Sequence, residues 1–439
     1  MMKILVTGAK GFIGKNLIAW LRNRNYQNIF EFDIDTKEEL LDEYCREADF
    51  VFNLAGINRP KRVEEFMEGN RDFVATLLHS LRKHGNNCPI LLSSSVQAEL
   101  NNPYGASKRA GEELYLNHGR ETGAKVFVYR LPNVFGKWCR PNYNSAVATF
   151  CNNIARDLPI TVNDPEVILK LVYIDDVIEE FVKVLEETVK VKENAPPASE
   201  DHDNTWIKED APPRSEDHDN IWIKEDVPPR SEVHDNIWII ENAPLRSKDE
   251  NNFYGEGKCG EDKIHSIPTV YQVRLGYVAD LLYSFQACRE NLEVPELSDD
   301  FTKKLYSTYL SYLPTDQFAY PLKMNEDERG SFTEFIRTKD RGQVSVNISK
   351  PGIVKGNHWH HTKNEKFLVV AGKGVIRFRA INGYDIIQYF VDGEKLQVVD
   401  IPPGYTHNIE NLGESELVTV MWVNEPFDKE RPDTYYLEV

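Results

Sequence analysis

The chain has 439 residues, of which 41% are hydrophobic and 28% are charged, and its formal net charge is −18. This length corresponds to about three folded units. No run reaches the ~18 consecutive apolar residues of a membrane-spanning helix, and the acidic balance argues against a nucleic-acid partner. The first residues run directly into a strand pattern, so no signal peptide is expected. The six cysteines lack paired spacing, which favours reduced thiols in a cytoplasmic protein.

Short apolar strands alternate with helical segments over residues 1–190. The strands predicted are Lys3–Thr7, Phe50–Leu54, Ile90–Ser94 and Val126–Tyr129. Such alternation is typical of βαβ units around a parallel sheet. The pattern resumes near residue 263, with helices predicted over Tyr277–Cys288 and Asp300–Leu313. We therefore predict one α/β domain of Rossmann type from residues 1–190 and 263–314.

The segment between these two parts, residues 191–262, contains a tandem repeat with a period of sixteen residues. Its three complete copies are Asn194–Glu209, Asp210–Glu225 and Asp226–Glu241, each with a net charge of −3. High charge, several prolines and one Trp-Ile pair per copy bury too little apolar surface to offset the entropy of ordering. We predict a disordered acidic insertion. A Trp-centred partner motif and metal capture by the repeated histidines are the alternatives.

A glycine-rich motif follows the first predicted strand and opens a helix predicted over Lys15–Leu21. In this motif Gly8 permits a tight turn, Gly11 lets a pyrophosphate approach the backbone, and Gly14 allows close packing of helix and strand. We predict a dinucleotide site.

The sequence gives conflicting signals on the choice of coenzyme. Asp33 and Asp35 end the second strand, where an acidic residue normally binds the ribose 2′-hydroxyl and favours NAD. Lys10 could instead neutralise the 2′-phosphate of NADP. Both possibilities stay open.

Three serines, Ser93–Ser95, end another strand and precede Tyr104-Gly-Ala-Ser-Lys108. Tyr104 and Lys108 are four residues apart and share one face of a helix. A cation beside a phenol lowers the phenol pKa toward the range of an acid/base catalyst, and a serine hydroxyl would hold the substrate oxygen.

After Pro314 the sequence changes to short β-branched runs broken by glycine and proline, which predicts an all-β sandwich or barrel over residues 315–439. His358 and His360 are two apart, so on a strand both point to one face. Glu365 and His407 would close on them from neighbouring strands. Three imidazoles and a carboxylate around an open position suit Zn²⁺ or another divalent transition metal.

The N-terminal motifs resemble the extended short-chain dehydrogenases/reductases. The residues that carry the resemblance are Gly8-x-x-Gly11-x-x-Gly14, Asn53-Leu-Ala-Gly56, Ser95, Tyr104-x-x-x-Lys108 and Tyr129-Arg-Leu-Pro-Asn133. The resemblance implies Tyr104 as the general acid/base, Lys108 as the ligand of the nicotinamide ribose, and Ser95 as the group that orients the reacting carbonyl. The coenzyme contacts expected are Gly8, Lys10, Gly11, Phe12, Ile13, Gly14, Asp33, Leu54, Ala55, Gly56, Tyr104 and Lys108. Family members usually act on nucleotide sugars, which places Asn133, Trp138 and Asn142 at the substrate.

The C-terminal motifs carry two resemblances. The segments Gly352–Glu365 and Pro402–Asn411 have the spacing of cupins, which are jelly-roll proteins. Asp327-Glu-Arg329-Gly-Ser-Phe-Thr-Glu334 and Gly352–His358 also resemble the dTDP-4-keto-6-deoxyhexose 3,5-epimerases, which are metal-free. There the residue matching His358 is the base, and those matching Arg329 and Glu334 hold the nucleotide sugar. His358 thus remains open as ligand or base, with Lys355 as a second candidate for proton transfer; His360, Glu365 and His407 are the safer ligands.

Apart from the insertion, the whole chain resembles the bifunctional enzymes of bacterial capsular polysaccharide synthesis on the route to UDP-N-acetyl-L-fucosamine. The resemblance implies C3 epimerisation of a UDP-2-acetamido-2,6-dideoxy-4-ketohexose by the cupin. Reduction of the C4 ketone with NADPH, or with NADH, then gives UDP-2-acetamido-2,6-dideoxy-L-talose. Members form homodimers. Two alternatives remain: a nucleotide-sugar 4-epimerase or dehydratase that retains NAD, and a non-catalytic sugar-nucleotide sensor.

Overall fold

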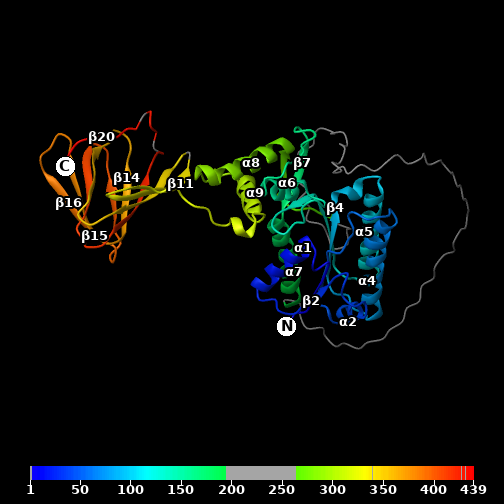
Figure 1. The fold of residues 1–439 in the computed structure, drawn as a ribbon. Helices are drawn as coiled ribbons and strands as arrows, with labels where there is room; N and C mark the ends of the chain where they lie inside the picture. The colour runs from blue at the N-terminus through cyan, green and yellow to red at the C-terminus, as the bar shows by residue number, and fades with distance from the viewer. Residues whose placement is uncertain (1, 194–263, 339, 427, 431) are drawn as a thin grey trace, which may run out of the picture. The chain divides into compact units, whose positions relative to one another are not determined.

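The computed structural model describes residues 2–193, 264–338, 340–426, 428–430 and 432–439. The acidic repeats lie outside these residues. Figure 1 shows an N-terminal part with helices around a sheet and a C-terminal part built of strands.

The N-terminal part contains a six-stranded sheet in which all neighbouring strands are parallel. Its strands are β1 (Ile4–Thr7), β2 (Ile29–Phe32), β3 (Phe50–Asn53), β4 (Ile90–Ser95), β5 (Val126–Leu131) and β8 (Ile264–His265). Their order is β2-β1-β3-β4-β5-β8. Strand β1 pairs with β2 on one side and with β3 on the other, so the strand order reverses at β1. Ligands of open α/β sheets bind where the order reverses in this way, at the carboxyl ends of the strands.

Helices cover both faces of this sheet. They are α1 (Phe12–Asn23), α2 (Glu39–Glu47), α4 (Phe73–Lys83), α5 (Pro103–Thr122) and α7 (Ile174–Glu193). Alternate residues of a strand point to opposite faces, so Ile4 and Val6 pack in one apolar core with α1 and α7, whereas Leu5 packs in the other with α2, α4 and α5. The predicted Rossmann-type architecture is confirmed.

The remaining elements of the N-terminal part are short or lie beyond the main sheet. They are α3 (Glu65–Met67), η1 (Glu68–Asp72), η2 (Val96–Glu99), β6 (Asn133–Phe135), α6 (Ala146–Ile154), β7 (Ile168–Tyr173), β9 (Tyr271–Arg274), α8 (Leu275–Asn291), α9 (Asp300–Leu310) and η3 (Thr315–Gln317). Strands β6, β7 and β9 form a small sheet of their own.

Two antiparallel sheets form the C-terminal part. One has the order β10-β11-β12-β19-β14-β17 and the other β16-β15-β18-β13-β20. The bounds are β10 (Asn325–Asp327), β11 (Gly330–Thr338), β12 (Gly342–Ser349), β13 (Val354–Trp359), β14 (Glu365–Ala371), β15 (Lys373–Ala380), β16 (Ile386–Asp392), β17 (Val398–Ile401), β18 (Tyr405–Asn411), β19 (Leu417–Val423) and β20 (Tyr435–Tyr436). An apolar core that includes Phe367, Ile376 and Ile409 draws on both sheets. This is the jelly-roll expected of a cupin.

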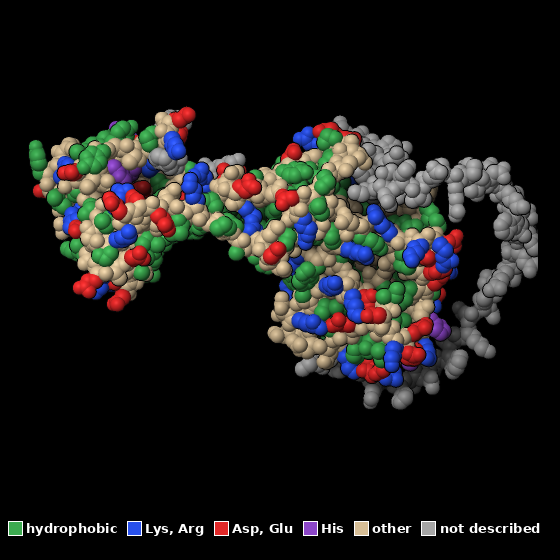
Figure 2. All heavy atoms as spheres, viewed as in Figure 1, with side chains coloured by type: hydrophobic (Ala, Val, Ile, Leu, Met, Phe, Trp, Pro, Cys, Tyr) green, Lys and Arg blue, Asp and Glu red, His purple; other side chains and the backbone are tan. Residues whose placement is uncertain are grey.

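The surface carries charges of both signs. On the face shown in Figure 2, basic and acidic side chains are interspersed and do not separate into single-sign stripes. None of the helices in the described residues is both long and apolar enough to cross a membrane.

Candidate active sites

The glycine motif forms the turn between β1 and α1, at the reversal of strand order. Gly8 has φ +65°, and a Cβ there would lie 2.8 Å from the backbone nitrogen of Ala55. A Cβ at Gly14 would lie 2.2 Å from the carbonyl oxygen of Gly8. Only glycine allows this loop to pack against both the end of β3 and its own helix. The N-terminus of α1, at Phe12, is therefore at the position predicted to bind a dinucleotide pyrophosphate.

The other predicted coenzyme residues surround this loop. Lys10 and Ile13 lie in the loop and the first turn of α1, and Leu54, Ala55 and Gly56 follow β3. Asp33 follows β2, and its carboxylate accepts a hydrogen bond from the backbone N–H of Lys10 at 2.7 Å. The topology thus brings the glycine loop, the residues after β3 and Asp33 after β2 together at one edge of the sheet.

The ammonium of Lys10 bonds the carboxylate of Asp35. This hydrogen bond lowers the pKa of Asp35 below its usual range. The two conflicting coenzyme signals of the sequence are therefore in direct contact: the cation available for a 2′-phosphate is paired with an acid.

The tyrosine, lysine and serine meet at the carboxyl ends of β3 and β4. Tyr104 lies in the first turn of α5, and Ser95, the last residue of β4, is near enough to its hydroxyl to influence the pKa of the phenol. The ammonium of Lys108 lies 5.8 Å from the centre of the Tyr104 ring. A Cβ at Gly56 would lie 2.9 Å from that ammonium, so Lys108 borders the predicted coenzyme loop. Ser94, by contrast, is buried and donates to Glu112 at 2.5 Å.

The electrostatics of this pair differ from the expectation that Lys108 lowers the pKa of the phenol. Burial raises the pKa of Tyr104 to about 12, although the neighbouring Ser95 opposes this rise. Burial also lowers the pKa of Lys108 to about 8. For both groups, desolvation disfavours the charged form and is the largest cause of the shift. The phenol is therefore protonated at neutral pH, the state required of a proton donor.

Sequence reasoning missed Asn58. The Tyr104 hydroxyl donates to Oδ1 of Asn58 at 3.0 Å. Asn58 stands two residues after Gly56, on the loop that leaves β3. The carboxyl ends of β3 and β4 are adjacent in a parallel sheet, but the contact spans 46 residues, so no local sequence pattern marks this amide.

The predicted substrate residues of this domain lie on β6 and the loop that follows it. Asn133 begins β6 and is exposed, as is Asn142. The Trp138 side chain is 53% exposed, and its backbone has φ +69°. No contact joins these three residues within the structure described, so their role stays a prediction.

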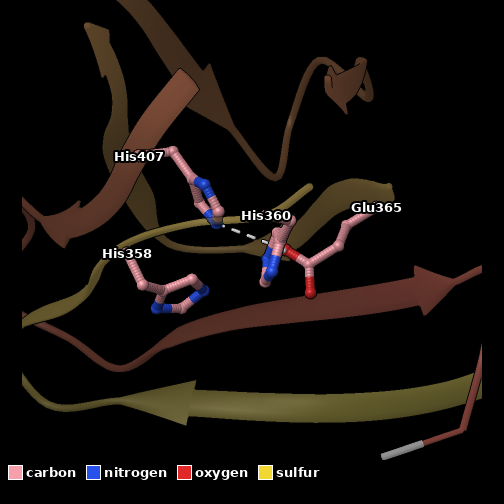
Figure 3. A group of neighbouring side chains, drawn as sticks. All are labelled: His358, His360, Glu365 and His407. Atoms are coloured by element: carbon pink, nitrogen blue, oxygen red, sulfur yellow. Dashed lines mark ion pairs between the residues drawn. The ribbon is translucent and has the colours of Figure 1, made fainter. Parts of the chain in front are cut away.

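In the C-terminal part the four predicted metal ligands converge (Figure 3). His358 is on β13 and His407 on the neighbouring β18, His360 directly follows β13, and Glu365 begins β14 of the other sheet. One possible ligand atom from each side chain lies within 4.8 Å of those from the others. His407 Nε2 is 3.2 Å from Glu365 Oε2, and His360 Nε2 is 3.6 Å from the same oxygen.

The donor set of this cluster fits a metal ion. His360 Nε2, His407 Nε2 and Glu365 Oε2 are buried and lack a hydrogen-bond partner in the described structure. Burial opposes ionisation of Glu365, but the nearby imidazoles of His360 and His407 outweigh burial and lower the pKa of Glu365 to about 2. Burial lowers the pKa of His358 to about 4, so this imidazole is neutral, as a ligand must be. Three imidazoles and one carboxylate are a donor set that Zn²⁺ accepts.

The other predicted residues of this part have partners outside the cluster. Lys355 Nζ donates to Asn347 Oδ1 at 2.8 Å and to the carbonyl oxygen of Ile348 at 2.9 Å. Arg329 pairs with Asp327, and Glu334 accepts two hydrogen bonds from Arg337. The structure therefore groups His358 with the other predicted ligands, and it gives no geometric argument for a role of Lys355 in proton transfer.

Two family descriptions match the chain. The NAD dependent epimerase/dehydratase family covers residues 4–195, and the Polysaccharide biosynthesis C-terminal domain covers residues 325–435. A UDP-2-acetamido-2,6-beta-L-arabino-hexul-4-ose reductase from Pseudomonas aeruginosa is 38% identical over 438 residues, which is 100% of this chain and 99% of that protein. The crystal structure of the capsular polysaccharide assembling protein CapF from Staphylococcus aureus is 48% identical, covers 100% of both chains and superposes with a TM-score of 0.79.

Proposed function

Because the chain belongs to the family of bifunctional capsular polysaccharide synthesis enzymes, which join an extended short-chain dehydrogenase/reductase to a C-terminal cupin, we propose that it acts twice on one nucleotide sugar. The C-terminal domain epimerises a UDP-2-acetamido-2,6-dideoxy-4-ketohexose at C3. The N-terminal domain then reduces the C4 ketone with NADPH, giving UDP-2-acetamido-2,6-dideoxy-L-talose. The observation that carries this proposal is the presence, in one chain, of a Tyr–Lys pair beside a coenzyme loop and a buried cluster of four metal-binding side chains.

In the reduction, hydride from the nicotinamide adds to the C4 carbon, and the phenol of Tyr104 gives its proton to the oxygen that becomes the hydroxyl. Ser95 and Asn58, which border the phenol, orient that oxygen and the phenolic O–H. Lys108 binds the nicotinamide ribose. The raised pKa of Tyr104 keeps the proton in place until hydride transfer makes the oxygen basic.

In the epimerisation, a base of the site, His358 or Lys355, removes the proton at C3, and a proton is returned on the opposite face of the sugar ring. A C–H bond beside a ketone is acidic only when the charge developing on the oxygen is stabilised, and a divalent metal supplies that stabilisation as a Lewis acid. His358, His360, Glu365 and His407 would hold the metal. For His358 the alternative is the role of base, and a His358→Ala protein that keeps its metal but loses C3 exchange would assign it that role.

We also propose a homodimer. Strand β16 is an edge strand of its sheet, and its first five residues are exposed, with Phe390 70% accessible. An exposed apolar edge strand is a surface that proteins normally cover. Light scattering of the purified protein should give twice the mass of the chain.

The proposal is tested by incubating the protein with the 4-keto sugar nucleotide in D₂O and following the sugar by NMR. Without coenzyme we expect deuterium at C3 and a persisting ketone. With NADPH, or NADH, we expect the alcohol and one equivalent of oxidised coenzyme. Product formed without net coenzyme consumption would indicate an NAD-retaining epimerase or dehydratase, and the absence of any turnover would favour a sensor.

A further inference from the structure

Two arginines converge on one aromatic ring in the N-terminal domain. The guanidinium carbon of Arg59 lies 6.0 Å from the centre of the Tyr143 ring, and that of Arg140 lies 5.2 Å from the same centre. Arg59 is on the loop after β3 and Arg140 on the loop after β6, so the fold brings them together from distant parts of the sequence. Both side chains are exposed.

Within the residues that the structure describes, no carboxylate pairs with either of these arginines. Among the ion pairs of the described residues, none includes Arg59 or Arg140, whereas Arg62 on the same loop pairs with Glu65 and Glu68. Two like charges on one ring repel each other, and in a chain of net charge −18 they form a local positive site. Such an arrangement attracts an anion.

The arginine pair borders the reacting end of the reductase site. Asn58, which precedes Arg59, accepts the hydrogen bond of the Tyr104 hydroxyl. Tyr143 is near enough to that phenol to contribute to its raised pKa, after burial. The phosphates of the coenzyme have their own binding loop at Gly8–Gly14. The anion that would face the two arginines is therefore a group of the substrate. Its diphosphate is attached at C1, across the sugar ring from the C4 ketone.

The loop that carries Arg140 is held in shape on both sides. The hydroxyl of Tyr312 donates to the carbonyl oxygen of Cys139 at 2.5 Å. The backbone N–H of Asn142 donates to Thr149 Oγ1 at 3.0 Å, and Asn142 has φ +54°. A loop fixed before the ligand arrives loses less entropy on binding.

We propose that Arg59 and Arg140, spaced by the Tyr143 ring, bind the diphosphate of the sugar nucleotide. Each guanidinium presents a planar fork of N–H donors that matches phosphate oxygens. The inference rests on the proposed reductase function and identifies the part of the substrate that this site recognises.

Calorimetry with UDP and with uridine tests this assignment without requiring turnover. The wild-type full-length protein should bind UDP more tightly than uridine. Arg59→Gln and Arg140→Gln should each weaken UDP binding about tenfold to a hundredfold, the effect of losing a charge-assisted hydrogen bond, and leave uridine binding unchanged. The matched control is Arg62→Gln, which should bind UDP as the wild type does.

Three results would overturn the inference. One is UDP affinity within twofold of wild type in the Arg59→Gln/Arg140→Gln protein. Another is a loss of NADPH affinity in place of UDP affinity, which would assign the arginines to the coenzyme. The third is a fall in kcat with an unchanged KM for the sugar nucleotide. If UDP binds as expected but no 4-keto sugar is reduced, the proposed function fails and the diphosphate site stands.

Discussion

Nδ1 of His360 lies 2.5 Å from the backbone carbonyl oxygen of Asp433. Because a carbonyl only accepts, Nδ1 carries the proton, and the lone pair of the neutral imidazole is on Nε2, the atom nearest Glu365. The carboxylate of Asp433 accepts hydrogen bonds from the backbone N–H groups of His361, Thr362 and Lys363, at 3.0, 2.9 and 2.9 Å. One residue near the C-terminus therefore fixes both the tautomer of a proposed ligand and the loop that follows it.

We expect Asp433→Ala to weaken metal binding about tenfold to a hundredfold, the usual effect of losing a group that orients a metal ligand. The carboxylate that holds the loop is removed, so His360 loses its fixed position. Asp433→Asn keeps an acceptor and tolerates the φ of +35° at this position, and should retain most of the affinity. Titration against a chromophoric chelator measures the effect. Asp400→Asn, at an exposed acid paired with Lys366, is the control. Equal metal affinity in the Asp433→Ala, Asp433→Asn and Asp400→Asn proteins would contradict the role assigned to Asp433.

The two activities should be separable by single substitutions. His407→Ala removes a buried donor and should abolish deuterium exchange at C3, while reduction of a ketone that is already epimerised continues. Tyr104→Phe should show the reverse pattern, with reduction lowered about 10²- to 10⁴-fold, the range of a lost general acid, and exchange retained. The Phe66 ring, 5.5 Å from that of Tyr104, should keep the new side chain in place. NMR in D₂O with each variant measures both reactions. Exchange that persists in His407→Ala, or loss of both activities in either variant, would refute the division between the two domains.

Much of the fold could be predicted because the relevant signals are local. The strands at the start of the chain and the helix after the glycine motif end within a few residues of their predicted bounds, because apolar alternation and glycine spacing depend on neighbours in sequence. The four metal-binding candidates were also predictable, since two histidines two residues apart on a strand would point to one face, although in the structure His360 directly follows β13.

Contacts between distant segments could not be predicted in the same way. Asn58 reaches Tyr104 across 46 residues and Asp433 reaches His360 across 73. Every residue has a backbone carbonyl, so the sequence could not indicate that the carbonyl of Asp433 contacts His360 or that the carbonyl of Ile348 contacts Lys355. The expected lowering of the Tyr104 pKa also failed, because a sequence shows the neighbouring cation but not the depth of burial.

The pH dependence of reduction should reflect Lys108. Burial lowers the pKa of Lys108 to about 8, although Glu112 opposes the shift. The ammonium is charged below that pH and loses its proton above it, so kcat/KM for reduction should fall about tenfold per pH unit above pH 8. Tyr104, with a pKa raised to about 12, stays protonated throughout this range. Lys108→Arg keeps a charge at all these pH values and should give a lower but flat profile. A wild-type profile that stays flat to pH 10 would show that the charge of Lys108 is not required.

The preference for NADPH over NADH should be limited by the contact between Lys10 and Asp35. Asp35→Asn removes the carboxylate that pairs with the Lys10 ammonium and leaves this cation available to a 2′-phosphate. Both side chains are largely exposed, so the ratio of kcat/KM for NADPH to that for NADH should rise only about two- to fivefold, the value of a surface ion pair. Lys10→Ala should lower the same ratio, while Asp42→Asn, at a partly buried acid paired with Lys83, should leave it unchanged. Steady-state kinetics with both coenzymes at low ionic strength measure these ratios, since salt screens an exposed pair.

If neither Asp35→Asn nor Lys10→Ala changes the ratio, Lys10 does not bind the 2′-phosphate. Asp33, whose carboxylate accepts from the backbone N–H of Lys10, would then be the residue that determines coenzyme choice.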